Sequence, residues 1–163
     1  MTKTYRSGAV GALLDEYERA ILELHQVVAA IPDQALPIVI DPHTANEDCR
    51  SVQTVLTHVV SSGFGYATSI HQLQQPDVSR PAKRLRHTTA EYLADLNSVF
   101  AFTENVLRKI GDAELEQLDA SRKIQTGWGQ IYDVEQLMEH AIVHILRHRR
   151  QLEKFSLLLN PTI

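Results

Sequence analysis

The sequence predicts an all-α protein, a four-helix bundle with long connections between its helices. Four long segments carry apolar residues at the i, i+3, i+4 spacing of an amphipathic helix. No segment predicts a sheet, because the short apolar run at 38–40 is confined between Pro37 and Pro42. Since one domain takes about 100–200 residues, we expect residues 1–163 to form a single bundle domain.

The first two helices are expected at about Ser7–Ile31 and Ser51–Leu73. Pro32 and Asp33 end the first, because proline cannot continue a helix interior. The apolar stripe of the first helix comprises Val10, Leu13, Leu14, Tyr17, Ile21, Leu24, Val27 and Val28. That of the second comprises Val52, Val55, Leu56, Val59, Val60, Phe64, Ala67 and Ile70.

The third helix is expected to begin at a capping box, with Thr88 as N-cap and Glu91 three residues later. Gly111 is a typical residue to end it. The connections on either side are longer than is usual in bundles. Short helical turns such as Asp112–Leu118 would accommodate that length.

The fourth helix is expected from Asp133, with Gln136 three residues later, to about Leu159, where Asn160-Pro161 ends it. Four amphipathic helices of this length favour a bundle, since each must bury its apolar stripe against the others.

The composition excludes several classes of protein. The chain has 16 Lys and Arg against 20 Asp and Glu, a formal net charge of −4, which argues against a broad grip on nucleic acid. Basic residues at 80–87 and 147–150 leave a weak nucleic-acid alternative, although no aromatic residues interleave with the loop charges. A single cysteine, Cys49, allows no disulfide framework. With no apolar run of about 18 residues and no apolar signal core after the N-terminus, we expect a cytoplasmic protein with no membrane partner.

The eight histidines are the most informative residues, and three of them recur four apart on the fourth helix: His140, His144 and His148. Two imidazoles four residues apart on a helix can converge on one metal ion. A helix turns by about 100° per residue. On that basis His148 lies about 40° from the centre of the buried stripe of the fourth helix, His144 about 80° and His140 about 120°. The inward pair is therefore His144 and His148. His140 is expected either at the rim of the site or in contact with a metal-binding residue without binding the metal itself.

The second helix offers a partner in His58. It lies on a strip of small side chains that leave room for a groove: Ser51, Thr54, Ser62, Gly65 and Ser69. Metal binding by His58, His144 and His148 competes with a simpler reading, in which the imidazoles are packed, hydrogen-bonded side chains. A zinc-protease helix is not indicated, because Ala141 and Ile145 stand where its glutamate would follow the histidine.

Four further residues have both a functional and a structural interpretation. Glu47 and Asp48 could act as a base or accept a hydrogen bond from a ligand, yet acidic residues also favour helix starts. Cys49 could be a reactive thiol or a packed small residue. Trp128 could cover the groove, anchor a dimer or plug the bundle end. The remaining histidines are expected on the surface: His25, His43, His71 and His87.

Two segments resemble motifs of the DinB/YfiT-like superfamily. His144–Gln151 resembles the H-x3-H-R-G-Q string that closes the last helix of that family. Cys49–Val59 resembles its second-helix start, where a W-S-x-x-E-like run precedes a metal histidine. The resemblance covers essentially the whole chain. Two departures are Arg150 in place of the glycine, and Cys49-Arg50 where the tryptophan would stand.

The resemblance implies a four-helix bundle, usually a homodimer, with a divalent metal held by His58, His144 and His148. It implies a metal-dependent enzyme, either a thiol-dependent S-transferase or a hydrolase, with a small thiol or a small electrophile as substrate. The alternative is a non-catalytic, metal-stabilised bundle with a binding or stress-response role. Zinc or nickel is the expected metal, although three imidazoles also suit iron and copper.

Overall fold

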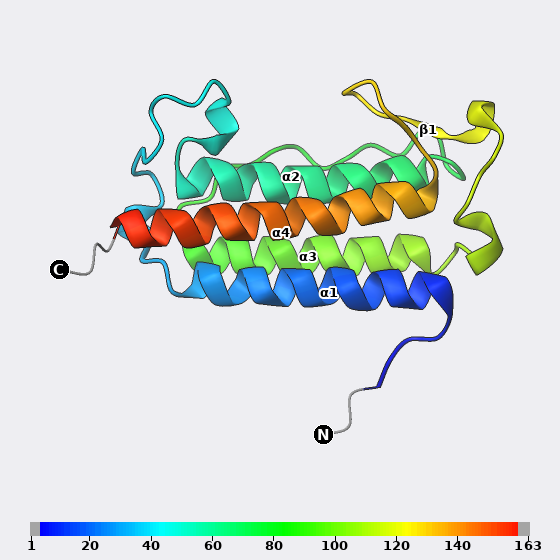
Figure 1. Ribbon diagram of the computed structural model, residues 1–163, viewed down its shortest axis with the longest axis horizontal. Coiled ribbons are helices and arrows are strands. Elements are labelled where there is room, and N and C mark those ends of the chain that lie inside the picture. The colour runs from blue at the N-terminus through cyan, green and yellow to red at the C-terminus, as the bar shows by residue number, and fades with distance from the viewer. Residues whose placement is uncertain (1–3, 160–163) are drawn as a thin grey trace.

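The four predicted helices form the bundle (Figure 1). The computed structural model describes residues 4–159. The helices are α1 Gly8–Ala29, α2 Val52–His71, α3 Thr89–Leu107 and α4 Val134–Leu159. The predicted bounds therefore hold to within two residues, except at the end of α3.

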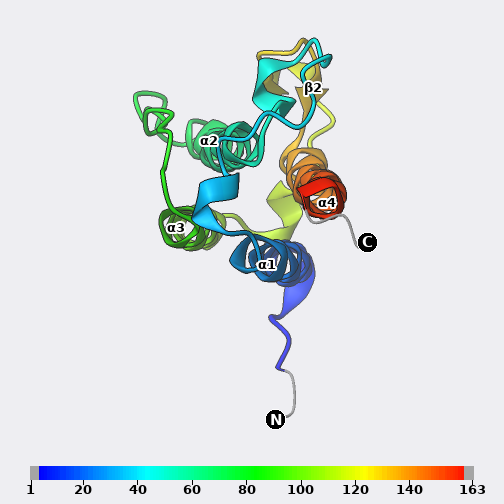
Figure 2. The ribbon, with the colours of Figure 1, turned by 90° about the vertical axis from the view of Figure 1, so that its left-hand side faces the viewer.

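Each helix packs against two neighbours, so that α1 lies diagonally opposite α2, and α3 opposite α4 (Figure 2). Figure 1 shows α1 and α4 running in one direction and α2 and α3 in the other. The connection between the parallel helices α2 and α3 must therefore return along the length of the bundle. This explains why that connection is long.

The predicted apolar stripes meet in one core cluster. From α1 the buried residues include Leu14, Tyr17, Ile21, Leu24 and Val28, and from α4 they include Val134, Met138, Ala141, Ile145 and Leu152. Burying such side chains is the main favourable contribution to folding, at roughly 25 cal/mol per Å² of apolar surface. The core therefore fixes which face of α4 turns inward, and with it the direction of the histidines.

The predicted capping box of α3 is present, and α4 begins with a second one. At the start of α3, the Thr88 hydroxyl accepts a hydrogen bond from the Glu91 backbone N–H, and Glu91 accepts one from the Thr88 N–H. Asp133 and Gln136 exchange the same pair of bonds before α4. Each pair satisfies two backbone donors that the first helical turn leaves unpaired.

The predicted end of α3 is wrong. The helix stops at Leu107, and Gly111 instead precedes the short 3-10 turn η3, Asp112–Glu114, where its N–H donates to the Glu114 carboxylate. A short turn inside 112–118 was expected, and η3 supplies it. The predicted stop of α4 at Asn160-Pro161 lies outside the described residues.

The expectation of no sheet missed a small hairpin. Strands β1, Ile124–Gln125, and β2, Ile131–Tyr132, pair antiparallel before α4. Strands of two residues are too short to show an alternating pattern, and Gly129 makes the tight turn with a positive φ of 86°. Further 3-10 turns are η1 Asp33–Ala35 and η2 Glu47–Cys49 between α1 and α2, and η4 Ala120–Arg122 just before the hairpin. Within residues 4–159, no helix is long and apolar enough to cross a membrane.

Candidate metal centre

Three histidine side chains from two neighbouring helices converge between α2 and α4. His58, His144 and His148 each offer a nitrogen atom, and these atoms lie within 4.8 Å of one another. The Nε2 atoms of His58 and His144 are 2.9 Å apart, and the rings of His144 and His148 are 4.5 Å apart at their centroids. The structure thus brings together the three residues that the sequence predicted.

Two of the three rings are oriented by partners at Nδ1. His58 Nδ1 lies 3.3 Å from the Asp48 carboxylate, and His148 Nδ1 lies 2.9 Å from the side-chain oxygen of Gln151. An amide oxygen can only accept, so the His148 Nδ1 carries the proton and its Nε2 keeps the lone pair. Such contacts on the far nitrogen are the usual way in which proteins orient metal-binding imidazoles.

Asp48 is itself held in place. Lys83 on the α2–α3 connection donates a hydrogen bond to the Asp48 carboxylate at 2.6 Å. The backbone N–H of Asp48 donates to the side-chain oxygen of Asn46 at 3.0 Å. Burial raises the pKa of Asp48, but the hydrogen bonds and charges of Lys83 and His58 together outweigh this, so the net shift is downward and the carboxylate stays ionised. Glu47 has no such role, because its exposed side chain pairs with Arg50.

The environment keeps the histidine cluster neutral. Burial, and then the neighbouring imidazoles His148 and His58, lower the pKa of His144 to about 3. Burial lowers the pKa of His148 to about 4, although its bond to Gln151 opposes the shift. Burial is also the largest cause of the lowered pKa of His58. Neutral imidazoles are the form that binds metal ions.

The donor set fits a divalent transition metal. Neutral imidazole nitrogens suit zinc, nickel, iron and copper, and three protein ligands are typical of a centre that keeps a position open. His144 Nδ1 is buried with no hydrogen-bond partner in the described part of the chain. The ring is therefore fixed by packing, with its Nε2 directed at His58.

A pocket of about 600 Å³ opens beside the cluster. The small α2 residues Ser62, Gly65 and Ser69 line it, as the groove prediction required. Ser51 and Thr54, expected on the same groove, instead form the capping box of α2. At a helix start, such hydroxyls pair with backbone N–H groups that the first turn leaves without a partner, so they are not available to the groove.

Aromatic side chains form one wall of the pocket. Trp128, at the tip of the β1–β2 hairpin, stacks on His140 with ring centroids 5.3 Å apart, and Tyr66 meets both rings edge-on. His140 thus lines the pocket without joining the ligand group, at the rim position that its helical angle predicted. Trp128 lines the pocket against His140, in agreement with the interpretation that it covers the groove, while its role as a dimer anchor stays a prediction.

The remaining candidates are resolved as follows. Cys49 is buried and its thiol does not line the pocket, in agreement with the packing interpretation. His43 and His87 are exposed, as expected. The prediction was wrong for His25 and His71, which are half-buried. The His71 ring packs 6.3 Å from that of Phe102, a contact across helices that spacing along one helix does not show.

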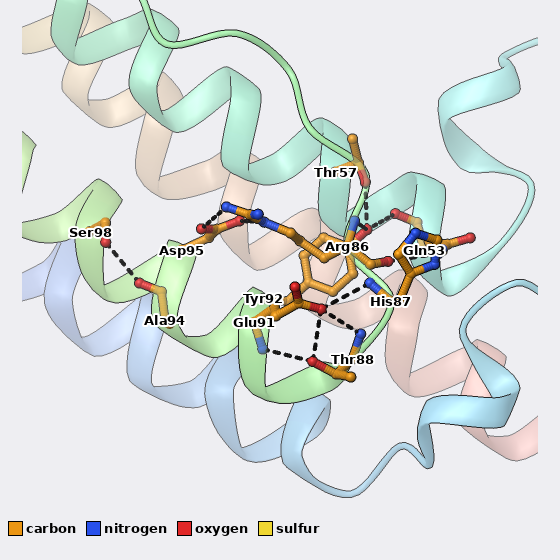
Figure 3. A network of polar contacts seen from close by, with 10 residues as sticks. All are labelled: Gln53, Thr57, Arg86, His87, Thr88, Glu91, Tyr92, Ala94, Asp95 and Ser98. Carbon is orange, nitrogen blue, oxygen red and sulfur yellow. Dashed lines mark hydrogen bonds and ion pairs between the residues drawn. The ribbon is translucent and has the colours of Figure 1, made fainter.

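A polar network holds the α2–α3 connection against the bundle (Figure 3). The buried Tyr92 hydroxyl donates to the Gln53 carbonyl and accepts from the Arg86 backbone N–H. The Arg86 side chain forms two bonds with Asp95, at 2.8 and 3.0 Å. This network fixes the C-terminal end of the α2–α3 connection. The same connection brings Lys83 close to the histidine cluster.

Sequence reasoning assigned neither Gln151 nor Lys83 a role in orienting the histidines. Gln151 follows His148 by three residues, so its position on the same helix face was a usable signal. Lys83 meets Asp48 across 35 residues of sequence, and no local pattern indicates such a pairing.

The chain belongs to the DinB family, whose model matches residues 2–155. The bundle and the three-histidine cluster described above agree with this membership. No curated protein matches the chain.

Proposed function

We propose that this protein binds one zinc or nickel ion through His58, His144 and His148 and catalyses a metal-dependent reaction of a small molecule, with thiol transfer favoured over hydrolysis. The observation that carries the proposal is the joint position of three neutral imidazoles and a pocket that reaches them. An ion that only tied α2 to α4 would need no such opening. A solvent-connected pocket therefore favours an enzyme over the non-catalytic bundle.

When bound, the metal supplies a Lewis acid that lowers the pKa of a thiol or water at its open position. Hydrolytic metal centres commonly add a carboxylate as general base. Among residues 4–159, no Asp or Glu lines this pocket. This supports thiol transfer, in which the sulfur is the nucleophile and no carboxylate base is needed.

The chain's own residues have defined tasks in that reaction. Asp48 and Gln151 hold the Nδ1 atoms of His58 and His148, so both rings keep their orientation through turnover. His140 is the imidazole in the pocket outside the ligand group, and burial and then the charge of Arg147 lower its pKa, so its neutral ring can accept the thiol proton. The S–C bond forms as the bond between that carbon and the leaving group breaks, and the leaving group takes the electron pair. Trp128 and Tyr66 exclude water from that side of the pocket.

Elemental analysis of the purified protein tests the metal site. We expect close to one equivalent of zinc or nickel in the wild type and in His140→Ala, and a large loss in His58→Ala, His144→Ala and His148→Ala. A wild type that neither contains metal nor takes up added zinc or nickel would disprove the site.

A thiol-transfer assay with cysteine and a chlorodinitrobenzene tests the reaction. We expect the loaded wild type to accelerate thioether formation and His148→Ala to fall to the uncatalysed rate. Equal rates for both, with full metal content in the wild type, would favour the non-catalytic bundle. The homodimer and the cytoplasmic location stay predictions.

A further inference from the structure

The pocket beside the histidines has a charge opposite to that of the whole chain. The chain has 20 acidic and 16 basic residues, yet within the described residues the pocket lining contains no carboxylate and two arginines, Arg80 and Arg147. Neither guanidinium forms an ion pair or a hydrogen bond with another residue in the 4–159 range. By contrast, Lys83, Arg86 and Arg149, from the same two basic segments, all pair with carboxylates.

Arg147 is positioned by α4 itself. It follows His144 by three residues and precedes His148 by one, so it projects from the helix next to the histidine cluster. Its charge is one of the smaller causes that lower the pKa values of His58, His144 and His148, which is consistent with this closeness. The side chain is exposed and can turn toward a ligand in the pocket.

Arg80 reaches the pocket from the α2–α3 connection and lies over Gly65. A Cβ atom at position 65 would stand 3.2 Å from Arg80 Nη1 and 3.6 Å from its Cδ. The missing side chain of Gly65 therefore lets the guanidinium rest against α2. The network around Arg86 and Tyr92 anchors the end of the same connection.

The charges at this site favour an anion. Three neutral imidazoles would leave the charge of a divalent ion uncompensated, and the nearby carboxylate, Asp48, is engaged by Lys83. Guanidinium groups bind carboxylates and phosphates through paired, charge-assisted hydrogen bonds. The rings of Tyr66 and Trp128 offer an apolar surface to the body of an organic ligand.

We propose that the pocket binds a small organic anion, a carboxylate or a phosphate monoester, through Arg80 and Arg147. The inference rests on the proposed function, since it names the substrate class of the same site. The two arginines are specificity-determining residues that hold the anionic group, while the reacting group faces the histidines.

The fluorescence of Trp128 provides the assay, because it is the chain's single tryptophan and it lines the pocket. Metal-free and zinc-treated protein are titrated with phenylacetate, phenyl phosphate and the neutral isostere phenylacetamide. We expect at least one anion to bind about tenfold or more tightly than the amide, as a charge-assisted contact provides. The two anions together distinguish a carboxylate site from a phosphate site.

The variants Arg80→Gln and Arg147→Gln are expected to remove most of this preference. Arg84→Gln and Arg150→Gln delete the same charge from the same two segments outside the pocket, and should keep it. Equal binding of anion and amide, no binding of either, or a preference that survives both pocket variants would overturn the inference. Metal content is measured on the same samples. An anion preference without metal uptake would contradict the metal site and leave the anion site standing.

Discussion

The side chain of Gln151 accepts a hydrogen bond from His148 Nδ1 at 2.9 Å, one helical turn further along α4. Its amide nitrogen also donates to the backbone carbonyl of Cys49 at 3.4 Å. Gln151 thus joins one ring of the three-histidine cluster to the turn that carries Asp48, the partner of His58. One glutamine therefore couples the orientation of a histidine on α4 to the segment that orients the histidine on α2.

Gln151→Leu should weaken zinc or nickel binding by about 10–100-fold, the usual effect of losing a partner that orients a ligand. The leucine keeps the approximate size of the side chain but cannot accept from His148. Competition with a chromogenic chelator measures the affinity. Gln26→Leu, at an exposed position on α1, is the matched control. Equal affinity in the two variants would show that packing alone orients His148.

Asp48→Ala should also reduce metal affinity, by about tenfold or more, because His58 loses the acceptor at Nδ1. Asp48→Asn retains an acceptor oxygen but no charge, so its affinity should fall between those of the wild type and the alanine variant. Glu47→Ala removes a neighbouring carboxylate that faces solvent, and should change nothing. An effect of Glu47→Ala as large as that of Asp48→Ala would point to general electrostatics and exclude a specific contact.

The metal-free protein should lose stability as the pH falls below about 6.5, the ordinary pKa of histidine. The folded-state pKa values of His144 and His148 are lowered to about 3 and about 4. Between these values and 6.5 the unfolded chain binds protons that the folded chain does not, so lowering the pH favours unfolding. In this pH range each of the two histidines lowers the free energy of unfolding by up to about 1.4 kcal/mol for each pH unit of acidification.

Urea denaturation of chelator-treated protein at several pH values between 8 and 5 measures this slope. The double variant His144→Gln, His148→Gln lacks both groups and should show a shallower dependence. A slope unchanged by the double substitution would assign the acid sensitivity to other groups.

Tyr92→Phe should lower the free energy of unfolding by about 1–3 kcal/mol, the cost of leaving buried partners unsatisfied. The Tyr92 hydroxyl bonds Thr57, the Gln53 carbonyl and the Arg86 backbone N–H in the core-side network of Figure 3. Tyr132→Phe removes a hydroxyl from a half-buried ring on the hairpin and serves as the control. Equal denaturation midpoints for the two variants would contradict the anchoring role of Tyr92.

Much of the fold could be predicted because it depends on local signals. The spacing of apolar residues defines the buried face of α1 and α4, and the capping pairs Thr88–Glu91 and Asp133–Gln136 set where α3 and α4 begin. The end of α3 was missed because Gly111 satisfies its backbone through Glu114 in a new turn, and a glycine alone does not distinguish the two outcomes.

By itself, the sequence determined the four helices and the direction of the three histidines, because one helical period sets both the buried stripe and the angle of each imidazole to it. Only the tertiary structure decided what surrounds them. Lys83 reaches Asp48, Arg80 lies over Gly65, and the hairpin brings Trp128 onto His140. These contacts join segments far apart in the chain. They depend on the way in which the long connections fold back over α2 and α4. The local spacing of residues does not predict the course of these connections.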